Sequence, residues 1–176
     1  MNSEPVSAYK KALVVIFFGY ILLLFETAMG FPFQFGQIRL DGLVPLVAWY
    51  GLQHPLPGGI LAVLGLGILS EQMSAMPDGL YVLAYAGEYL MVRYILNHIV
   101  FTAALQKMML VSFLSIEVVA VLLIGSGAAE LLWPWGFAQA LLNGIIAPFW
   151  FFVFDKTNSF ICSENMWPGV KKQVEV

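Results

Sequence analysis

The segment ALVVIFFGYILLLF, residues 12–25, is the clearest indication of the fold class. It holds no charged side chain. Extended to Ala28, it approaches the roughly 20 residues that a helix needs to cross about 30 Å of hydrocarbon. Lipid offers the backbone no hydrogen bonds, so such a block must form a helix or a closed barrel. Barrel strands would alternate apolar and polar residues, which this stretch does not do. It therefore predicts a transmembrane helix.

Five further apolar blocks follow and give the same prediction. The six segments are expected at residues 12–28, 42–53, 58–69, 79–96, 108–127 and 135–154. The second and third are short for a full crossing, and the turn signal HPLPGG at 54–59 separates them. A broken, re-entrant pair is the alternative to two crossings, which we favour. The expected fold class is an all-α integral membrane protein with six transmembrane helices in one domain, 12–154, between short tails at 1–11 and 155–176.

Composition supports this class. Hydrophobic residues make up 60% of the chain and charged residues 11%, whereas soluble domains have about 45–50% and about 25%. The net charge is −3 and the eight Lys and Arg residues are scattered, so no basic patch for nucleic acid is present. The single cysteine, Cys162, excludes an internal disulfide and a cysteine-rich metal site.

The distribution of basic residues predicts the orientation. Cytoplasmic loops of membrane proteins carry an excess of Lys and Arg. Six crossings with both termini inside leave only Arg39 on the outer side and put seven basic residues inside: Lys10, Lys11, Arg93, Lys107, Lys156, Lys171 and Lys172. The expected orientation therefore has both termini on the cytoplasmic side of the membrane.

Polar residues inside the predicted helices are the first candidate site. Glu88 and Glu117 lie within the fourth and fifth segments, and Gln139 and Asn143 within the sixth. A charged group at the bilayer centre costs about 2.5–3.5 kcal/mol on insertion scales, so such residues face the bundle and find partners. Glu88 and Glu117 could serve a proton relay, an ion site or a substrate contact. The structural alternative is a hydrogen bond to Gln139 or Asn143, or a carboxyl kept neutral by burial.

Two further groups of residues suggest contacts between proteins. Phe33, in an apolar loop, and the acidic residues Asp41, Glu71 and Asp78 are predicted in outer connections and are candidates for partner contact. Gly58, Ala62 and Gly65 form a small-residue stripe in the third segment. Such stripes let membrane helices approach closely. The stripe would allow close packing within the chain, or it would form a contact surface for a second copy or for a partner protein.

Catalytic signatures are missing from the sequence. It has no His-Glu-x-x-His, no Gly-x-Ser-x-Gly and no phosphate-binding loop. Its only histidines, His54 and His98, fall in different predicted loops. The expectation is a protein that is not an enzyme, with no catalytic residues, no cofactor and no metal site.

Three segments carry a resemblance to a known family. The segment LDGLVPLVAWYGL at 40–52 is similar to a Pro-Asp motif followed by a Leu-rich run. The segment GLGILSE at 65–71 is similar to a Gly-Leu-rich helix that ends in an acidic residue. The segment SAMPDGLY at 74–81 is similar to a Ser-Gly-x-Pro-x-Gly turn. Together they resemble the MreD family of rod-shape-determining proteins. Glu71 stands where that family usually has Asp. The likeness covers roughly residues 10–156, including the six-helix plan.

The resemblance implies a non-enzymatic membrane component of the bacterial cell-elongation complex. Such a component binds a bitopic MreC-like protein, and through it the cell-wall synthesis machinery. The family also resembles the substrate-binding subunits of energy-coupling-factor transporters, and fold alone does not settle function. The alternative is therefore a small-molecule-binding transporter subunit, with a pocket near the outer surface for which Glu26, Glu71, Tyr81 and Trp135 are candidates. A third alternative, an intramembrane enzyme, requires Glu88 and Glu117 to converge on a water-filled cavity.

Overall fold

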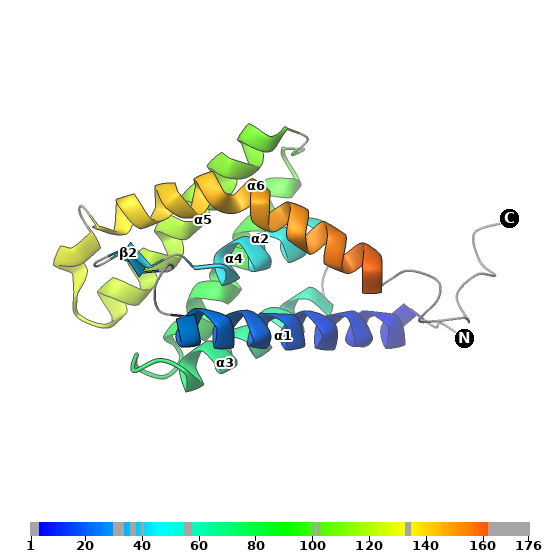
Figure 1. The fold of residues 1–176 in the computed structure, drawn as a ribbon, viewed down its shortest axis with the longest axis horizontal. Coiled ribbons are helices and arrows are strands. Elements are labelled where there is room, and N and C mark those ends of the chain that lie inside the picture. Colours follow the sequence, from blue (N-terminus) through cyan, green and yellow to red (C-terminus); the bar gives the residue numbers. More distant parts are fainter. Residues whose placement is uncertain are drawn as a thin grey trace, which may run out of the picture.

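Six α-helices account for nearly all of the residues that the structure describes. The structure is a computed structural model that describes residues 4–29, 34–35, 38–39, 41–54, 58–99, 101, 103–132 and 135–161. The helices are α1 (Glu4–Met29), α2 (Leu43–Gln53), α3 (Gly58–Gln72), α4 (Leu80–Leu96), α5 (Ala104–Gly125) and α6 (Trp135–Ile161). Figure 1 shows that α1 begins and α6 ends on the same side of the molecule.

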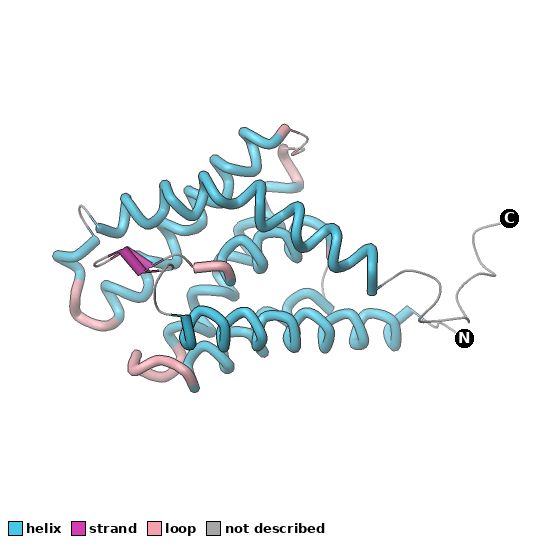
Figure 2. Tube along the Cα trace, viewed as in Figure 1, coloured by secondary structure: helices cyan, strands magenta, loops and turns pink. Residues whose placement is uncertain are grey.

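Two small elements complete the fold. Strands β1 (Gln34–Phe35) and β2 (Ile38–Arg39) pair antiparallel in the connection between α1 and α2. A short 3₁₀ helix, η1 (Ala129–Leu132), lies between α5 and α6. The strands appear in magenta in Figure 2 beside the helical body.

The six predicted helices are all present, and their ends differ from the prediction mainly at the termini. α1 begins at Glu4 rather than Ala12, and α6 ends at Ile161 rather than Phe154. Parts of both expected tails are therefore helical. The apolar blocks mark where lipid contact is favourable, whereas a helix continues until its backbone hydrogen bonding is interrupted. Pro5 in the first turn of α1 is compatible with an early start, because it lacks an N–H that would have no partner there.

The short helix α2 forms the centre of the bundle. Every residue from Leu43 to Gly51 is buried, and α2 contacts each of the other five helices. Its sequence is apolar on all sides, which is typical of a helix enclosed by others rather than one with a single lipid-facing stripe. The cyan α2 in Figure 1 accordingly lies between α1, α4 and α6.

Three helices are long and apolar enough to cross a membrane. These spans are Lys11–Ala28, Ala104–Gly125 and Trp135–Ser159. Their outer faces expose large apolar side chains, which suits contact with lipid rather than water: Leu13, Phe17, Met109, Phe113, Leu141, Ile145 and Phe152. The chain therefore has the features of a membrane protein in contact with a bilayer. α2 and α3 are shorter, about 16 Å and 22 Å at about 1.5 Å per residue.

Glycines bring α3 close to its two neighbours. A Cβ added at Gly65 would lie 2.7 Å from Ile16 Cδ1 of α1, and one at Gly67 would lie 2.7 Å from the Val82 Cα of α4. Ala62, between them and the helix start, is fully buried. The predicted small-residue stripe of Gly58, Ala62 and Gly65 is thus used for packing within the chain, as is common between membrane helices.

Candidate functional site

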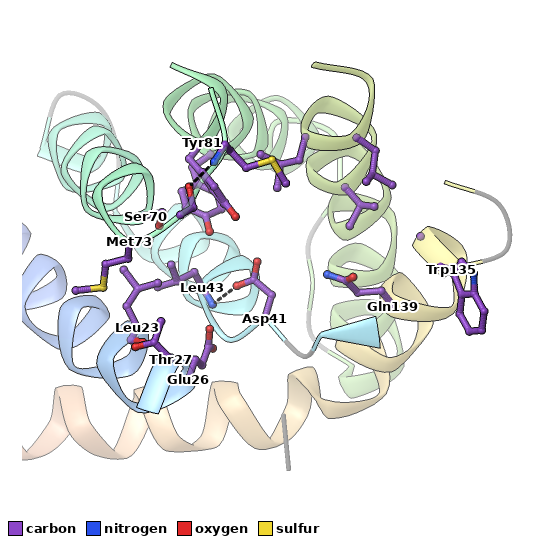
Figure 3. A pocket seen from close by; sticks show the side chains of 17 residues that line it. Leu23, Glu26, Thr27, Asp41, Leu43, Ser70, Met73, Tyr81, Trp135 and Gln139 are labelled. Carbon is purple, nitrogen blue, oxygen red and sulfur yellow. Dashed lines mark hydrogen bonds between the residues drawn. The ribbon is translucent and has the colours of Figure 1, made fainter. Parts of the chain in front are cut away.

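A cavity opens at the end of the bundle where α1, α3 and α5 end and α2, α4 and α6 begin. Its volume is about 300 Å³, at the lower limit of about 300–1,000 Å³ for small-molecule sites. In Figure 3, Glu26 and Thr27 belong to α1, Ser70 and Tyr81 to α3 and α4, and Gln139 to α6, whereas the Trp135 ring at the start of α6 points away from the other side chains. The wall also includes Leu23, Asp41, Leu43, Met73, Ser74, Met76, Tyr85, Val119, Leu122, Leu123 and Gly136.

Two carboxyl groups in this wall are held by the start of α2. The backbone N–H of Gly42 donates to Glu26 Oε1 at 2.7 Å, and that of Leu43 donates to Asp41 Oδ1 at 2.9 Å. The first N–H groups of a helix have no partner within the helix and attract negative charge. Glu26 is only 5% exposed. Its side chain, at the end of α1, caps the start of α2 and holds the two helix ends together.

Asn143 connects the cavity wall to the interior between α5 and α6. The backbone N–H of Asp41 donates to Asn143 Oδ1 at 3.2 Å, and Asn143 Nδ2 donates to Ser115 Oγ at 2.8 Å. Asn143 and Ser115 are both buried. This bridge fixes Asp41, two residues before α2, against Ser115 of α5 and Asn143 of α6, which are more than seventy positions away along the chain.

The acidic residue Glu71 has a structural role beside the cavity. Its Oε1 accepts a hydrogen bond from the Val82 N–H in the first turn of α4 at 3.1 Å. Glu71 is not part of the cavity wall, whereas Glu26, Tyr81 and Trp135 are. Of the four candidates for a ligand pocket, the structure therefore places three in the cavity wall and Glu71 outside it. Asp78 is exposed in the turn before α4, and Phe33 lies outside the described residues.

Glu88 and Glu117 form a second polar region, between α4 and α5. Glu88 is fully buried, and Glu117 is half-buried. Both oxygens of Glu88 and Oε2 of Glu117 are buried without a hydrogen-bond partner among the described residues. The predicted hydrogen bond from Glu88 to Gln139 or Asn143 is not formed, because Asn143 is turned toward Ser115 and Asp41 and Gln139 lies in the cavity wall.

The opposite end of the bundle gathers basic residues around the end of α2. Arg93 donates to the Gly51 carbonyl at 3.2 Å, and Lys107 lies 5.6 Å from the centre of the Phe151 ring. Asp155 accepts hydrogen bonds from Trp49 Nε1 at 2.7 Å and Gln53 Nε2 at 3.0 Å. Asp155 is not among the candidates predicted from the sequence, although an acidic residue directly after a run of aromatic residues suggests a hydrogen-bond partner within the bundle.

His54 ends α2 at this basic end. Its ring lies 4.5 Å from the Tyr50 ring, and its carbonyl accepts a hydrogen bond from the Tyr89 hydroxyl at 2.9 Å. Burial lowers the pKa of the His54 imidazole below its ordinary value, and the positive charge of Lys11 lowers it further. The neutral imidazole is therefore favoured in the folded protein.

The cavity wall is largely aromatic, aliphatic and thioether, with a few polar side chains among them. Two of these, Glu26 and Asp41, accept hydrogen bonds at the start of α2. Across the described part of the chain, no group of three His, Cys, Asp or Glu residues is placed to hold a metal ion. Glu88 and Glu117 do not line the cavity. Comparison of the chain with protein-family models, characterised proteins and solved structures gives no match.

Proposed function

We propose that this chain is a non-enzymatic component of a bacterial cell-elongation complex, and that it binds a bitopic MreC-like partner in the inner membrane. One observation carries the proposal. The three segments that resemble the MreD family, 40–52, 65–71 and 74–81, form α2, the end of α3 and the start of α4. These elements pack together and supply Asp41, Ser70 and Tyr81 to one end of the bundle.

The alternation of the helices supports six crossings with both termini on the cytoplasmic side. The ends of α1, α3 and α5 meet the starts of α2, α4 and α6 around the cavity. The basic residues Lys11, Arg93, Lys107 and Lys156 belong to the opposite end, which the positive-inside rule assigns to the cytoplasm. The short helices α2 and α3 then require a thinned bilayer or a position enclosed by longer helices.

The test is affinity purification of the tagged full chain from native membranes after mild crosslinking. We expect recovery of a bitopic coiled-coil protein together with cell-wall synthases. Recovery of an ATPase pair with a membrane coupling subunit would instead contradict the elongation role. The same purification from cells that express an unrelated six-helix membrane protein with the same tag is the control.

The cavity supports one second candidate function, a small-molecule-binding subunit of an energy-coupling-factor-type transporter. A ligand that binds only the folded state raises its stability by an amount that grows with the logarithm of the ligand concentration above the Kd. Under this function, one member of a panel of vitamins should raise the melting temperature of the purified chain. Asp41→Asn, in the wall, should abolish the shift, whereas Glu71→Gln, outside the wall, should not. An absence of any shift across the panel would rule against this candidate.

A further inference from the structure

The carboxyl groups of Glu88 and Glu117 lie near the middle of their helices. Glu88 is the central residue of α4 (Leu80–Leu96), and Glu117 lies within about 4 Å of the midpoint of α5 (Ala104–Gly125) along its axis. At that depth neither water nor a lipid headgroup is available as a partner. Three of their four carboxyl oxygens are buried without a hydrogen bond among the described residues.

Glu117 lies in the seam between the two helices and reaches the outside of the bundle. A Cβ added at Gly87 would lie 2.8 Å from Glu117 Oε1, so the carboxyl group rests on the part of α4 that has no side chain. Glu117 is half-buried rather than buried. Of the two carboxyl oxygens, Oε2 is buried, so Oε1 is the atom that a molecule packing against α4 and α5 from outside would contact.

The surroundings of Glu117 form an apolar face on the two helices. Leu83, Gly87 and Leu90 follow spacings of four and three on α4, and Phe113, Glu117 and Ile124 follow spacings of four and seven on α5, so each set shares one side of its helix. Leu83, Leu90, Phe113 and Ile124 are 61%, 50%, 54% and 61% exposed. We call these six residues the Glu117 face.

A carboxyl group on a lipid-facing surface is unfavourable unless something donates a hydrogen bond to it. Apolar lipid tails cannot do so, whereas polar side chains on neighbouring membrane helices form hydrogen bonds with one another. A second transmembrane helix can supply both the missing donor and an apolar surface to cover the neighbouring Leu and Phe residues.

We propose that the Glu117 face is the seat of a partner's single transmembrane helix, and that this helix donates a hydrogen bond to Glu117 from a polar side chain at mid-depth. The identity of the native partner rests on the proposed function, because a bitopic protein contributes one such helix. The chemistry of the contact is that of an Asn, Gln, Ser, Thr or Lys donor within an otherwise apolar span.

A direct test uses a model helix rather than the native partner. The probe is a labelled Leu- and Ala-rich transmembrane peptide with one Asn at its centre, and its matched control has Leu in place of Asn. Association with the full chain is measured by energy transfer in lipid vesicles with the peptide at trace concentration. We expect the Asn peptide to bind about three- to twentyfold more tightly than the Leu peptide, the range that corresponds to one hydrogen bond within a membrane.

Three variants locate the contact. Glu117→Leu should remove the preference for the Asn peptide. Leu90→Trp should weaken binding of both peptides, because the larger side chain covers the face, whereas Leu141→Trp on α6, at a position that is 61% exposed, should leave binding unchanged. Equal binding of the two peptides, or an undiminished preference in Glu117→Leu, would overturn the proposal.

These outcomes are separable from those of the proposed function. If purification recovers a bitopic elongation protein but the Glu117 face fails the peptide test, the partner binds elsewhere and only the present inference falls. If the peptide preference depends on Glu117 but no elongation protein is recovered, the helix seat stands and the cell-elongation role falls.

Discussion

Two buried carboxyl groups in this bundle have opposite surroundings. Glu26, at the cavity end, is 5% exposed and accepts a 2.7 Å hydrogen bond from the Gly42 N–H. Glu88, in the middle of α4, is 0% exposed, and its two oxygens have no partner among the described residues. Glu26 therefore stabilises a junction between helices, whereas Glu88 is a polar group whose burial is not offset within the chain.

The difference shows that burial alone does not define the role of an acidic residue. A buried acid that receives a helix N–H replaces a water molecule and fixes two helices relative to each other. A buried acid without a donor lowers the stability of the isolated chain, and such groups gather at functional sites. The carboxyl groups at the cavity end thus hold helix ends together, whereas the region between α4 and α5 contains carboxyl oxygens that no described residue pairs with.

The sharpest test of this comparison replaces each acid by methionine, which has a similar shape and no carboxyl group. Glu26→Met should destabilise the protein by about 1–3 kcal/mol, because the buried Gly42 N–H loses its acceptor. Glu88→Met should stabilise it by a similar amount, because an unpartnered polar group is removed. The measurement is reversible unfolding in mixed detergent micelles. Destabilisation by both changes would mean that Glu88 has a partner of its own, and the comparison would then be wrong.

A smaller effect is expected at Asn143, which connects the Asp41 backbone in the cavity wall to Ser115 of α5. Asn143→Leu should lower the free energy of unfolding by about 1–2 kcal/mol, because the Asp41 N–H and the Ser115 hydroxyl each lose a hydrogen bond. Gln139→Leu, one turn earlier on α6 in the cavity wall, is the matched control and should cost less. An equal loss in the two variants would mean that the bridge contributes no more than a polar residue of the cavity wall.

The contact between Gly87 and Glu117 should give an effect of about 1 kcal/mol or less. An added Cβ at Gly87 would crowd Glu117 Oε1, while alanine improves helix propensity by about 1 kcal/mol. Gly87→Ala should therefore be neutral or mildly destabilising in the wild-type background and stabilising in the Glu117→Ala background. The coupling is read from the double-mutant cycle. Additive effects would place the carboxyl away from Gly87.

The smallest effect concerns pH. Because the pKa of His54 is lowered on folding, the unfolded chain binds the proton more tightly, and stability falls as the pH drops below the unfolded value of about 6.5. The melting temperature should therefore decrease between about pH 7.5 and pH 5.5, and His54→Gln should reduce that decrease. His98→Gln, at an exposed position, serves as control. A slope unchanged by His54→Gln would remove this histidine from the pH response.

Much of this architecture could be predicted from apolar patterning. Long apolar blocks are local features, so the six helices and most of their ends were predictable to within a few residues. Glu88 and Glu117 were also identifiable, because a carboxyl group within an apolar block is conspicuous. Glu26 was a candidate for a pocket, but its hydrogen-bond partner was not predictable. The donor is the backbone N–H of Gly42, and a pattern of side chains does not show which backbone groups lack a partner.

Apolar patterning is enough to predict a helical membrane protein with acidic residues at one set of helix ends, because hydrocarbon requires each block to satisfy its own backbone hydrogen bonds. The three-dimensional packing is needed to show that α2 lies at the centre, that Glu26 and Asp41 line a cavity, and that Glu71 instead caps α4. These outcomes depend on which helix faces meet, and close packing sets those contacts between residues far apart in the chain.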